Sequence, residues 1–287
     1  MKHGRLICLF VLPLALITVI KAWGYDGHRR INRQAAQVLK GPLGQFLMHN
    51  ESALTWYGPV PDYLKGSDPN EFYRHFIDLD NYDAVPFNQI PMDYDSLLAK
   101  YGRENVRNWG IAPWAIQAVC DRIIKLLKEQ RFDEAVYNMG ILSHYVADLH
   151  MPLHTVKNYN GQLTGNDGVH FRWEARLVND YLVTIQPVGT PPEINNPLLF
   201  AFDIARESYS VHQRILAADT KARRVLTTEQ VKQLNSYDIL PFEKPYLDVL
   251  YRESGDLLKE QSGLAVTRIA AYWRYCWQKA GSPELPR

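Results

Sequence analysis

The sequence predicts an all-α protein made of a single multi-helix domain, and three observations support this fold class. Apolar residues recur at the spacing of one helix face through residues 31–39, 115–127, 135–149, 198–216 and 264–277. The alternation of apolar and polar residues that is typical of strands is scarce. No repeat, low-complexity tract or block of like charge divides the chain.

The chain divides into a predicted secretory signal peptide, residues 1–22, and a mature domain, residues 23–287. Lys2 and Arg5 precede the apolar run "LICLFVLPLALITVI", and the small residue Ala22 ends the segment. Pro13 interrupts this run, which is short for a membrane span, although an uncleaved anchor is an alternative. We therefore expect a secreted or periplasmic protein of 287 minus 22, or 265, residues.

Removing the signal leaves a nearly neutral chain. Lys2, Arg5 and Lys21 would be lost, so 29 basic residues face 31 acidic residues and the formal charge becomes −2. A nearly neutral protein lacks the extended positive surface that attracts nucleic acid or anionic lipid. Binding of a phosphate substrate would therefore depend on the local charge of bound metals. The sequence leaves open whether the two remaining cysteines, Cys120 and Cys276, form a disulfide or stay buried thiols.

Helix-start and helix-stop residues give expected boundaries. Gly41 and Pro42 predict the end of the first mature helix, and Asp133 is a candidate cap for the helix over 135–149. The Thr-Thr-Glu-Gln run at 227–230 predicts another helix start. The helix over 135–149 carries apolar residues on most faces, which indicates a central position among other helices.

Five potential metal ligands fall within one short segment. The stretch "ILSHYVADLHMPLH" contains His144, Asp148 and His154, and "GNDGVHFRWE" contains His170 and Glu174. Residues four apart lie on one helix face, so each His-x-x-x-acid pair can clamp a divalent cation. Imidazole combined with carboxylate suits zinc better than calcium or magnesium, and the absence of cysteine favours an open, catalytic site over a structural one.

Each of these features also has a simpler interpretation. One His-x-x-x-acid pair on a helix is more often a surface ion pair, but two pairs in apolar surroundings favour a metal site. If the signal is cleaved after Ala22, the amine and carbonyl of Trp23 could chelate a metal, with His28 close behind. The alternatives are a buried aromatic and a histidine at a helix start.

Together with "WGYDGH" at the mature start and "RHFID", these motifs resemble the superfamily of zinc-dependent phospholipase C and S-one/P-one type nucleases. The resemblance covers residues 23–179 and implies three zinc ions. The implied ligands are Trp23, His28, Asp62, His75, His144, Asp148, His154, His170 and Glu174. Asp148 would bridge two zinc ions, and Asp62 would also be catalytic because it would orient the attacking water or accept its proton.

Part of the resemblance favours the nuclease branch. The spacing of five residues between Trp23 and His28 is similar to the corresponding spacing in that branch. Phe76 and Asp78, which follow His75, fall where those nucleases stack on a base and hydrogen-bond it. A similar His-Phe-x-Asp run also occurs in the phospholipases.

Other positions favour the phospholipase branch. Tyr63 and Phe72 fall where that branch places aromatic rings against a choline headgroup. Glu174 replaces the aspartate usual in the nucleases, and the interval before His170 is short. We therefore expect a phospholipase C-like phosphodiesterase, with a single-strand-specific endonuclease as the close alternative and a non-catalytic zinc-binding scaffold as a third. The substrate would be a phospholipid headgroup or single-stranded nucleic acid, and no obligate protein partner is evident.

Overall fold

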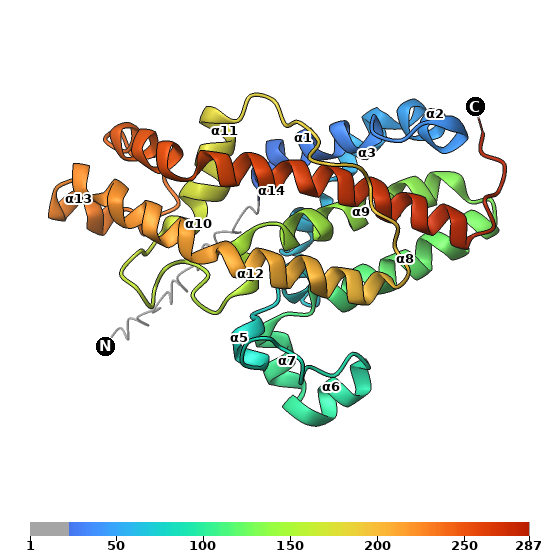
Figure 1. The fold of residues 1–287 in the computed structure, drawn as a ribbon, viewed down its shortest axis with the longest axis horizontal. Coiled ribbons are helices and arrows are strands. Elements are labelled where there is room, and N and C mark those ends of the chain that lie inside the picture. Colours follow the sequence, from blue (N-terminus) through green and yellow to red (C-terminus); the bar gives the residue numbers. More distant parts are fainter. Residues whose placement is uncertain (1–22, 287) are drawn as a thin grey trace, which may run out of the picture.

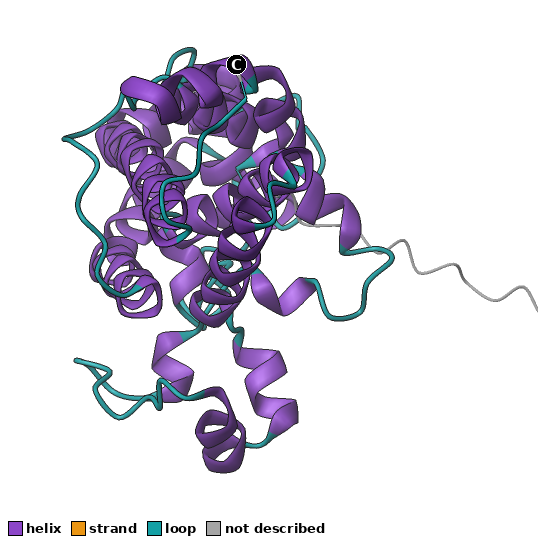
Figure 2. Cartoon of the chain, turned by 90° about the vertical axis from the view of Figure 1, so that its right-hand side faces the viewer, coloured by secondary structure: helices purple, strands orange, loops and turns teal. Residues whose placement is uncertain are grey.

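The computed structural model describes residues 23–286, so the predicted signal peptide lies outside the described residues. Within these residues the chain contains helices and no strands, which confirms the predicted all-α class (Figures 1 and 2). Every helix in this part of the chain is either too short or too polar to span a lipid bilayer.

The α-helices in chain order are α1 (Gly24–Ala36), α2 (Gly41–His49), α3 (Glu51–Tyr57), α4 (Val60–Leu64), α5 (Leu79–Tyr82), α6 (Tyr94–Tyr101), α7 (Arg103–Trp109), α8 (Ala112–Lys128), α9 (Phe132–Leu149), α10 (Val169–Phe171), α11 (Leu177–Tyr181), α12 (Pro197–Ala222), α13 (Thr228–Gln233) and α14 (Lys244–Lys279). The tighter 3₁₀ turns are η1 (Phe72–Arg74), η2 (Pro152–Thr155) and η4 (Arg223–Val225). A single π-helical turn, η3 (Arg172–Arg176), joins α10 to α11.

Helix α9 lies at the centre of the fold, as its apolar pattern predicts. It packs against α8, α3, α14, α12 and α1, and every residue from 139 to 149 is buried. Asp133 does not cap this helix, because α9 begins one residue earlier, at Phe132. Asp133 instead lies in the first turn, where a negative charge stabilises the helix dipole.

The two longest helices, α12 and α14, run antiparallel across one face of the molecule (Figure 1). Both pack on α8 and α9 and so close the core. Cys120 on α8 and Cys276 on α14 are buried and free, and the Cys276 Sγ lies 3.9 Å from the Cys120 carbonyl oxygen.

Two boundaries show how local chemistry sets the helix ends. The first helix ends at Ala36, and Gly41 begins α2, so the predicted stop at Gly41 and Pro42 is wrong. Proline fits the first helical turn because its missing N–H has no intrahelical partner there. The predicted start at 227–230 is confirmed, because Thr227 and Gln230 form a reciprocal capping box.

Close approach of α3 to α9 depends on Gly140. A Cβ atom at this position would lie 2.4 Å from the Cβ of Tyr57, so a larger residue would displace α3. One turn later on α9, His144 donates its Nδ1–H to the carbonyl oxygen of Gly58 at 2.8 Å. The glycine therefore lets the end of α3 orient an imidazole ring at the centre of the protein.

Helices α5, α6 and α7 project from one side of the helical body (Figure 1). Backbone hydrogen bonds join the base of this projection to the core: Ile77 N–H donates to the His154 carbonyl at 2.9 Å, and Asp78 N–H donates to the Trp109 carbonyl at 2.7 Å. These bonds fix the course of residues 75–78 beside η2.

Candidate metal centre

The structure brings together all eight side chains predicted as metal ligands, and each of them is buried. They come from separate segments of the chain: His28 from α1, Asp62 from α4, His75 from the end of η1, His144 and Asp148 from α9, His154 from η2, His170 from α10 and Glu174 from η3. Their donor atoms form three groups, each with all donors within 4.8 Å of one another: His28, His144 and Asp148; Asp62, His75 and His144; and His154, His170 and Glu174.

Asp148 belongs to the first group and also contacts the second. Its Oδ1 is 3.4 Å from Nε2 of His28, while its Oδ2 is 2.8 Å from Nδ1 of His75 and 3.2 Å from Nε2 of His144. Burial alone would raise the pKa of this carboxyl, but the neighbouring imidazoles, above all His144, hold the pKa well below its usual range. A carboxylate whose two oxygens face different donor groups is placed to bridge two cations.

Glu174 completes the third group from within the π-helical turn. Its Oε2 is 2.9 Å from Nε2 of His170, and its Oε1 is 3.5 Å from Nε2 of His154. Burial raises the pKa of Glu174, but the charges of His154 and His170 outweigh burial and lower the pKa to about 2. Single π turns of this kind are often found at functional sites.

Backbone carbonyls orient the imidazoles. His154 and His170 are held in the same way as His144. Nδ1–H of His154 donates to the carbonyl oxygen of His75 at 3.0 Å, and Nδ1–H of His170 donates to the carbonyl oxygen of Tyr159 at 3.0 Å. An Nδ1–H donated to a carbonyl leaves Nε2 as the atom with the free lone pair. In all three histidines this lone pair therefore faces the other members of the cluster.

The donor set fits divalent metal ions. Several buried atoms of the cluster make no hydrogen bond, namely both ring nitrogens of His28, Oδ2 of Asp62, Nε2 of His75, Oδ1 of Asp148 and both carboxylate oxygens of Glu174. Nε2 of His144 also lies only 2.9 Å from Nδ1 of His75, which brings two lone pairs together unless a cation or a proton lies between them. Unpaired buried polar groups are costly, and the nitrogen and oxygen donors here are those that zinc accepts.

Trp23 lies beside this cluster. Its buried indole donates Nε1–H to the carbonyl oxygen of Ala147 at 2.8 Å, and its ring packs against Trp173 at 6.1 Å between centroids. These contacts anchor the start of α1, the helix that carries His28. Chelation through a free amine of Trp23 stays a prediction, because it requires cleavage after Ala22, which lies outside the described residues.

Two charged residues at the cluster were not predicted from the sequence. Lys65 Nζ is 2.7 Å from Oδ1 of Asp62, and only 7% of its side chain is exposed. Glu71 Oε1 is 3.2 Å from Nε2 of His75 and accepts a hydrogen bond from the Tyr145 hydroxyl. Each lies three or four residues from a ligand, so helical spacing could have indicated both once Asp62 and His75 were known.

Glu71 is placed to orient His75, because its carboxylate contacts the ring nitrogen that faces away from the cluster. We expect Glu71→Gln to weaken zinc affinity about 10- to 100-fold, the usual effect of removing such a carboxylate partner of a ligating histidine. Competition with a chromophoric chelator would measure this. Glu134→Gln, an exposed change on α9, is the control, and equal affinities for the two variants would contradict a role for Glu71.

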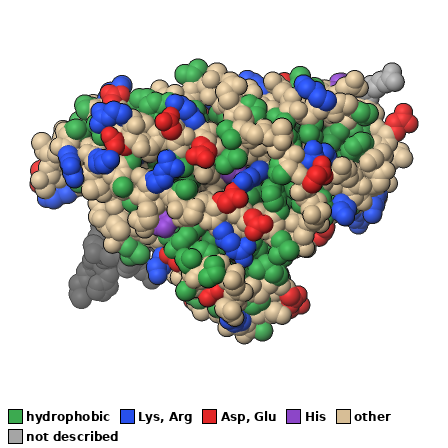
Figure 3. All heavy atoms as spheres, in the orientation of Figure 1, with side chains coloured by type: hydrophobic (Ala, Val, Ile, Leu, Met, Phe, Trp, Pro, Cys, Tyr) green, Lys and Arg blue, Asp and Glu red, His purple; other side chains and the backbone are tan. Residues whose placement is uncertain are grey.

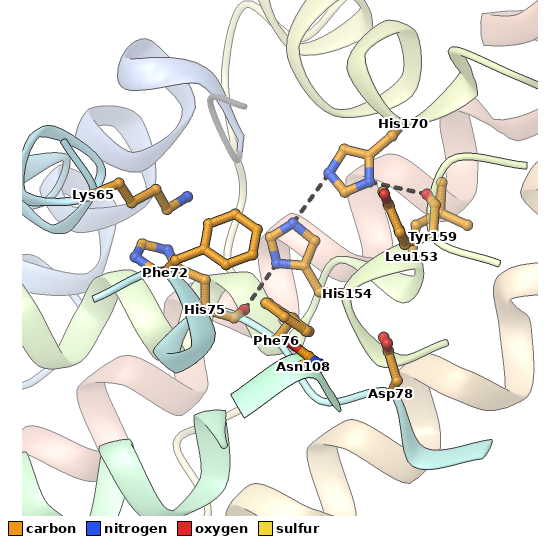
Figure 4. Close-up of a pocket in the computed structure, with 10 residues that line it drawn as sticks. All are labelled: Lys65, Phe72, His75, Phe76, Asp78, Asn108, Leu153, His154, Tyr159 and His170. Carbon is orange, nitrogen blue, oxygen red and sulfur yellow. Dashed lines mark hydrogen bonds between the residues drawn. The ribbon is translucent and has the colours of Figure 1, made fainter. Parts of the chain in front are cut away.

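A cavity of about 190 Å³ opens beside the third donor group (Figure 4). Phe72 and Phe76 form part of its wall, with ring centroids 5.5 Å apart in an edge-to-face arrangement. Asp78 and Asn108 add polar groups to the lining (Figure 4). We name this space the Phe72 cavity; its other lining residues are Lys65, His75, Leu153, His154, Tyr159 and His170.

Tyr63 does not line the Phe72 cavity. Its ring is stacked on that of Tyr25, with centroids 4.5 Å apart, and 52% of the residue is exposed. The structure therefore brings Phe72, Phe76 and Asp78 together and places Tyr63 elsewhere on the surface.

Asp78 is costly to bury as an anion. Burial, with a contribution from Asp80, raises its pKa to about 7. Because this pKa exceeds that of the unfolded chain, 3.8, the folded state binds more protons between these values and loses stability as the pH rises through them. We expect Asp78→Asn to stabilise the protein at pH 8 by up to about 4 kcal/mol and to have little effect near pH 4.

Urea unfolding of the zinc-free protein at both pH values would measure this effect of Asp78→Asn. The exposed change Asp95→Asn is the control, for which we expect no such pH-dependent gain. An equal stability change for Asp78→Asn at pH 4 and pH 8 would contradict the raised pKa.

Comparison with known proteins points to one branch of the resemblance. The chain is 23% identical over 188 residues to Nuclease S1 of Aspergillus oryzae (strain ATCC 42149 / RIB 40), and the match covers 60% of this chain. This similarity supports the S-one/P-one nuclease superfamily. It gives no support to the phospholipase C branch. The chain spans about 60% of the length of this relative. No family model matches the chain.

Proposed function

We propose that the chain is a zinc-dependent phosphodiesterase of the S-one/P-one type that hydrolyses single-stranded nucleic acid. The observation that carries this proposal is the convergence of eight buried imidazole and carboxylate side chains beside an aromatic cavity. The similarity to a nuclease supports the same conclusion.

Three zinc ions would be held by the three donor groups. His28 and the backbone of Trp23 would hold the first ion; Asp62, His75 and His144 the second; and His154, His170 and Glu174 the third. Asp148 would bridge the first two. Three carboxylates cannot neutralise three dications, so the loaded cluster would carry net positive charge and attract a phosphodiester anion.

The side chains of the chain have distinct roles in this scheme. When bound, zinc would lower the pKa of a water molecule and offset the charge that develops on the phosphate. The Asp62 carboxylate would accept the proton of the attacking water at Oδ2, the oxygen that makes no hydrogen bond. Lys65, beside Asp62, would hold a non-bridging phosphate oxygen through its ammonium group.

The Phe72 cavity supports nucleic acid as the substrate. The rings of Phe72 and Phe76 offer a stacking surface for a base, while the Asp78 carboxylate and the Asn108 amide can pair with groups on its edge. A base pair hides these edges, so the cavity favours a strand whose bases are free. On the face shown in Figure 3, basic and acidic side chains are interspersed, so recognition would rely on the cavity and the metals.

A phospholipid headgroup is less well supported than a base. The expected choline contact needs Tyr63 and Phe72 around one cation, but Tyr63 does not line the Phe72 cavity and one of its faces is covered by Tyr25. We also propose that the protein is exported, because the free amine of Trp23 would arise only after removal of residues 1–22.

The test is a comparison of substrates with zinc-loaded protein that begins at Trp23. We expect hydrolysis of single-stranded DNA and RNA that a chelator abolishes, slower hydrolysis of duplex DNA, and no release of phosphocholine from phosphatidylcholine micelles. Release of phosphocholine without nuclease activity would instead establish the phospholipase function. A folded, zinc-loaded protein that is inert on every substrate would favour a non-catalytic scaffold.

Asp62→Asn separates catalysis from metal binding in the same assay. We expect this variant to keep its zinc content and melting temperature while hydrolysis falls on the order of 10²- to 10⁴-fold, the usual contribution of a general base. Loss of zinc in parallel with activity would make Asp62 chiefly a ligand.

A further inference from the structure

Two pairs of side chains, joined through α1, lie beside the metal centre, and we name them the aromatic strip: Tyr25 on α1 with Tyr63 on α4, and Arg29 on α1 with Trp56 on α3. Tyr25 and Tyr63 are stacked with an angle of 27° between their planes. One turn after Tyr25, Arg29 places its guanidinium carbon 5.4 Å from the ring centre of Trp56. Trp56 is 65% exposed, so much of its surface is open to solvent.

The strip begins at the metal centre. Tyr63 directly follows Asp62 in α4, and the buried His28 lies between Tyr25 and Arg29 in the sequence of α1. None of the four strip residues lines the Phe72 cavity. The strip therefore lies on α1, α3 and α4 beside the donor cluster, while the cavity opens beside η1 and η2. A chain molecule with its scissile group at the metals could contact both.

We propose that the aromatic strip binds bases that flank the cleaved phosphodiester in single-stranded nucleic acid. Stacked aromatic faces suit this ligand because every base has a π face, whatever its sequence, and a guanidinium can meet either a base or a phosphate. The proposal rests on the proposed function, because it places the scissile phosphate at the metal centre. It extends that function by making the enzyme prefer oligonucleotides over dinucleotides.

The small net charge of the strip indicates that a ligand would bind by stacking on its rings and not by general attraction between opposite charges. Arg29 lies 3.3 Å from Asp26, whose side chain is 58% exposed, so the strip has little net charge. A nearly neutral strip gives weak attraction to an anionic membrane, although Trp and Tyr also occur at membrane surfaces. For nucleic acid it predicts a shallow salt dependence, with Arg29 contributing about one released counterion.

Trp56→Ala tests the proposal by kinetics. We expect KM for a single-stranded DNA of about twelve nucleotides to rise about tenfold with kcat unchanged, while both constants for a dinucleotide stay the same. Trp56→Phe should restore most of the lost affinity because it keeps an aromatic face. Unchanged KM for the longer strand would overturn the proposal.

A matched control is available outside the strip. Tyr251 on α14 stacks on Tyr181 with centroids 4.7 Å apart, a pair similar to Tyr25 and Tyr63 but outside the strip and the Phe72 cavity. Tyr251→Ala should leave KM for every substrate unchanged. An equal rise in KM for Tyr251→Ala and Trp56→Ala would mean a general effect on the fold and would overturn the assignment to the strip.

A binding assay keeps this proposal separate from the proposed function. Fluorescence anisotropy of a labelled oligonucleotide would be measured with zinc-loaded Asp62→Asn protein, with and without Trp56→Ala. We expect about tenfold weaker binding when Trp56 is absent, even if the wild type proves to have no nuclease activity. If oligonucleotide binding is unchanged while binding to anionic phospholipid vesicles falls, the strip is a membrane contact and the proposal is wrong.

Discussion

Asp148→Ala is expected to lower kcat/KM on single-stranded DNA on the order of 10³-fold or more, and to reduce the zinc content below that of the wild type. The two oxygens of this carboxylate face histidines of both neighbouring donor groups, so in the proposed scheme its removal would take a ligand from two metals at once. Metal analysis and steady-state kinetics on the purified variant would measure both effects.

Asp133→Ala is the matched control for Asp148→Ala, because Asp133 lies exposed in the first turn of the same helix. Loss of its interaction with the helix dipole should cost about 1 kcal/mol or less and leave activity unchanged. A variant at Asp148 that kept full zinc and normal activity would contradict the bridging role.

Removal of zinc is expected to inactivate the protein and lower its melting temperature. A ligand that binds only the native state stabilises it by about 4 kcal/mol at a free concentration 1,000 times Kd. Chelation withdraws this stabilisation and leaves the buried nitrogen and oxygen atoms of the cluster without cations. Calorimetry before and after chelation, with readdition of zinc, would measure the change. An unchanged melting temperature would contradict metal binding at this cluster.

Acid should have the same effect as the chelator, because protons compete with zinc for the five clustered imidazoles. An imidazole must be neutral to bind zinc, so we expect zinc affinity to fall as the pH is lowered. In the zinc-free protein the pKa of Glu174, about 2, lies below its ordinary value of 4.5. Its contribution to stability is therefore complete above pH 4.5 and is lost as the pH falls towards 2.

The main helices could be predicted from the sequence because their signals are local. The spacing of apolar residues reports which face of a helix is buried, and it located α8, α9, α12 and part of α14. Signals that depend on one residue were less reliable. Gly41 and Pro42 suit either a helix end or a first turn, and the packing of α2 against α1 and α3 decided between them.

Some ligands of the candidate site could be predicted from local spacing, and others could not. The pairs His144 with Asp148 and His170 with Glu174 could be found by spacing, since residues four apart meet on one turn. Asp62 lies far from these pairs in the chain, and only the family resemblance indicated it. Lys65 and Glu71 were missed because neither lies in a motif that indicates a metal site.

Local patterns in the sequence predicted the all-helical class, the central position of α9 and the types of donor available for metal ions. The tertiary structure alone decided which donors meet, because Gly140 sets how closely α3 approaches His144, and the bond from Ile77 to His154 sets where the Phe72 cavity opens. It also separated Tyr63 from that cavity. Local spacing governs which face of a helix is buried, whereas contacts between distant segments depend on packing that no short stretch encodes.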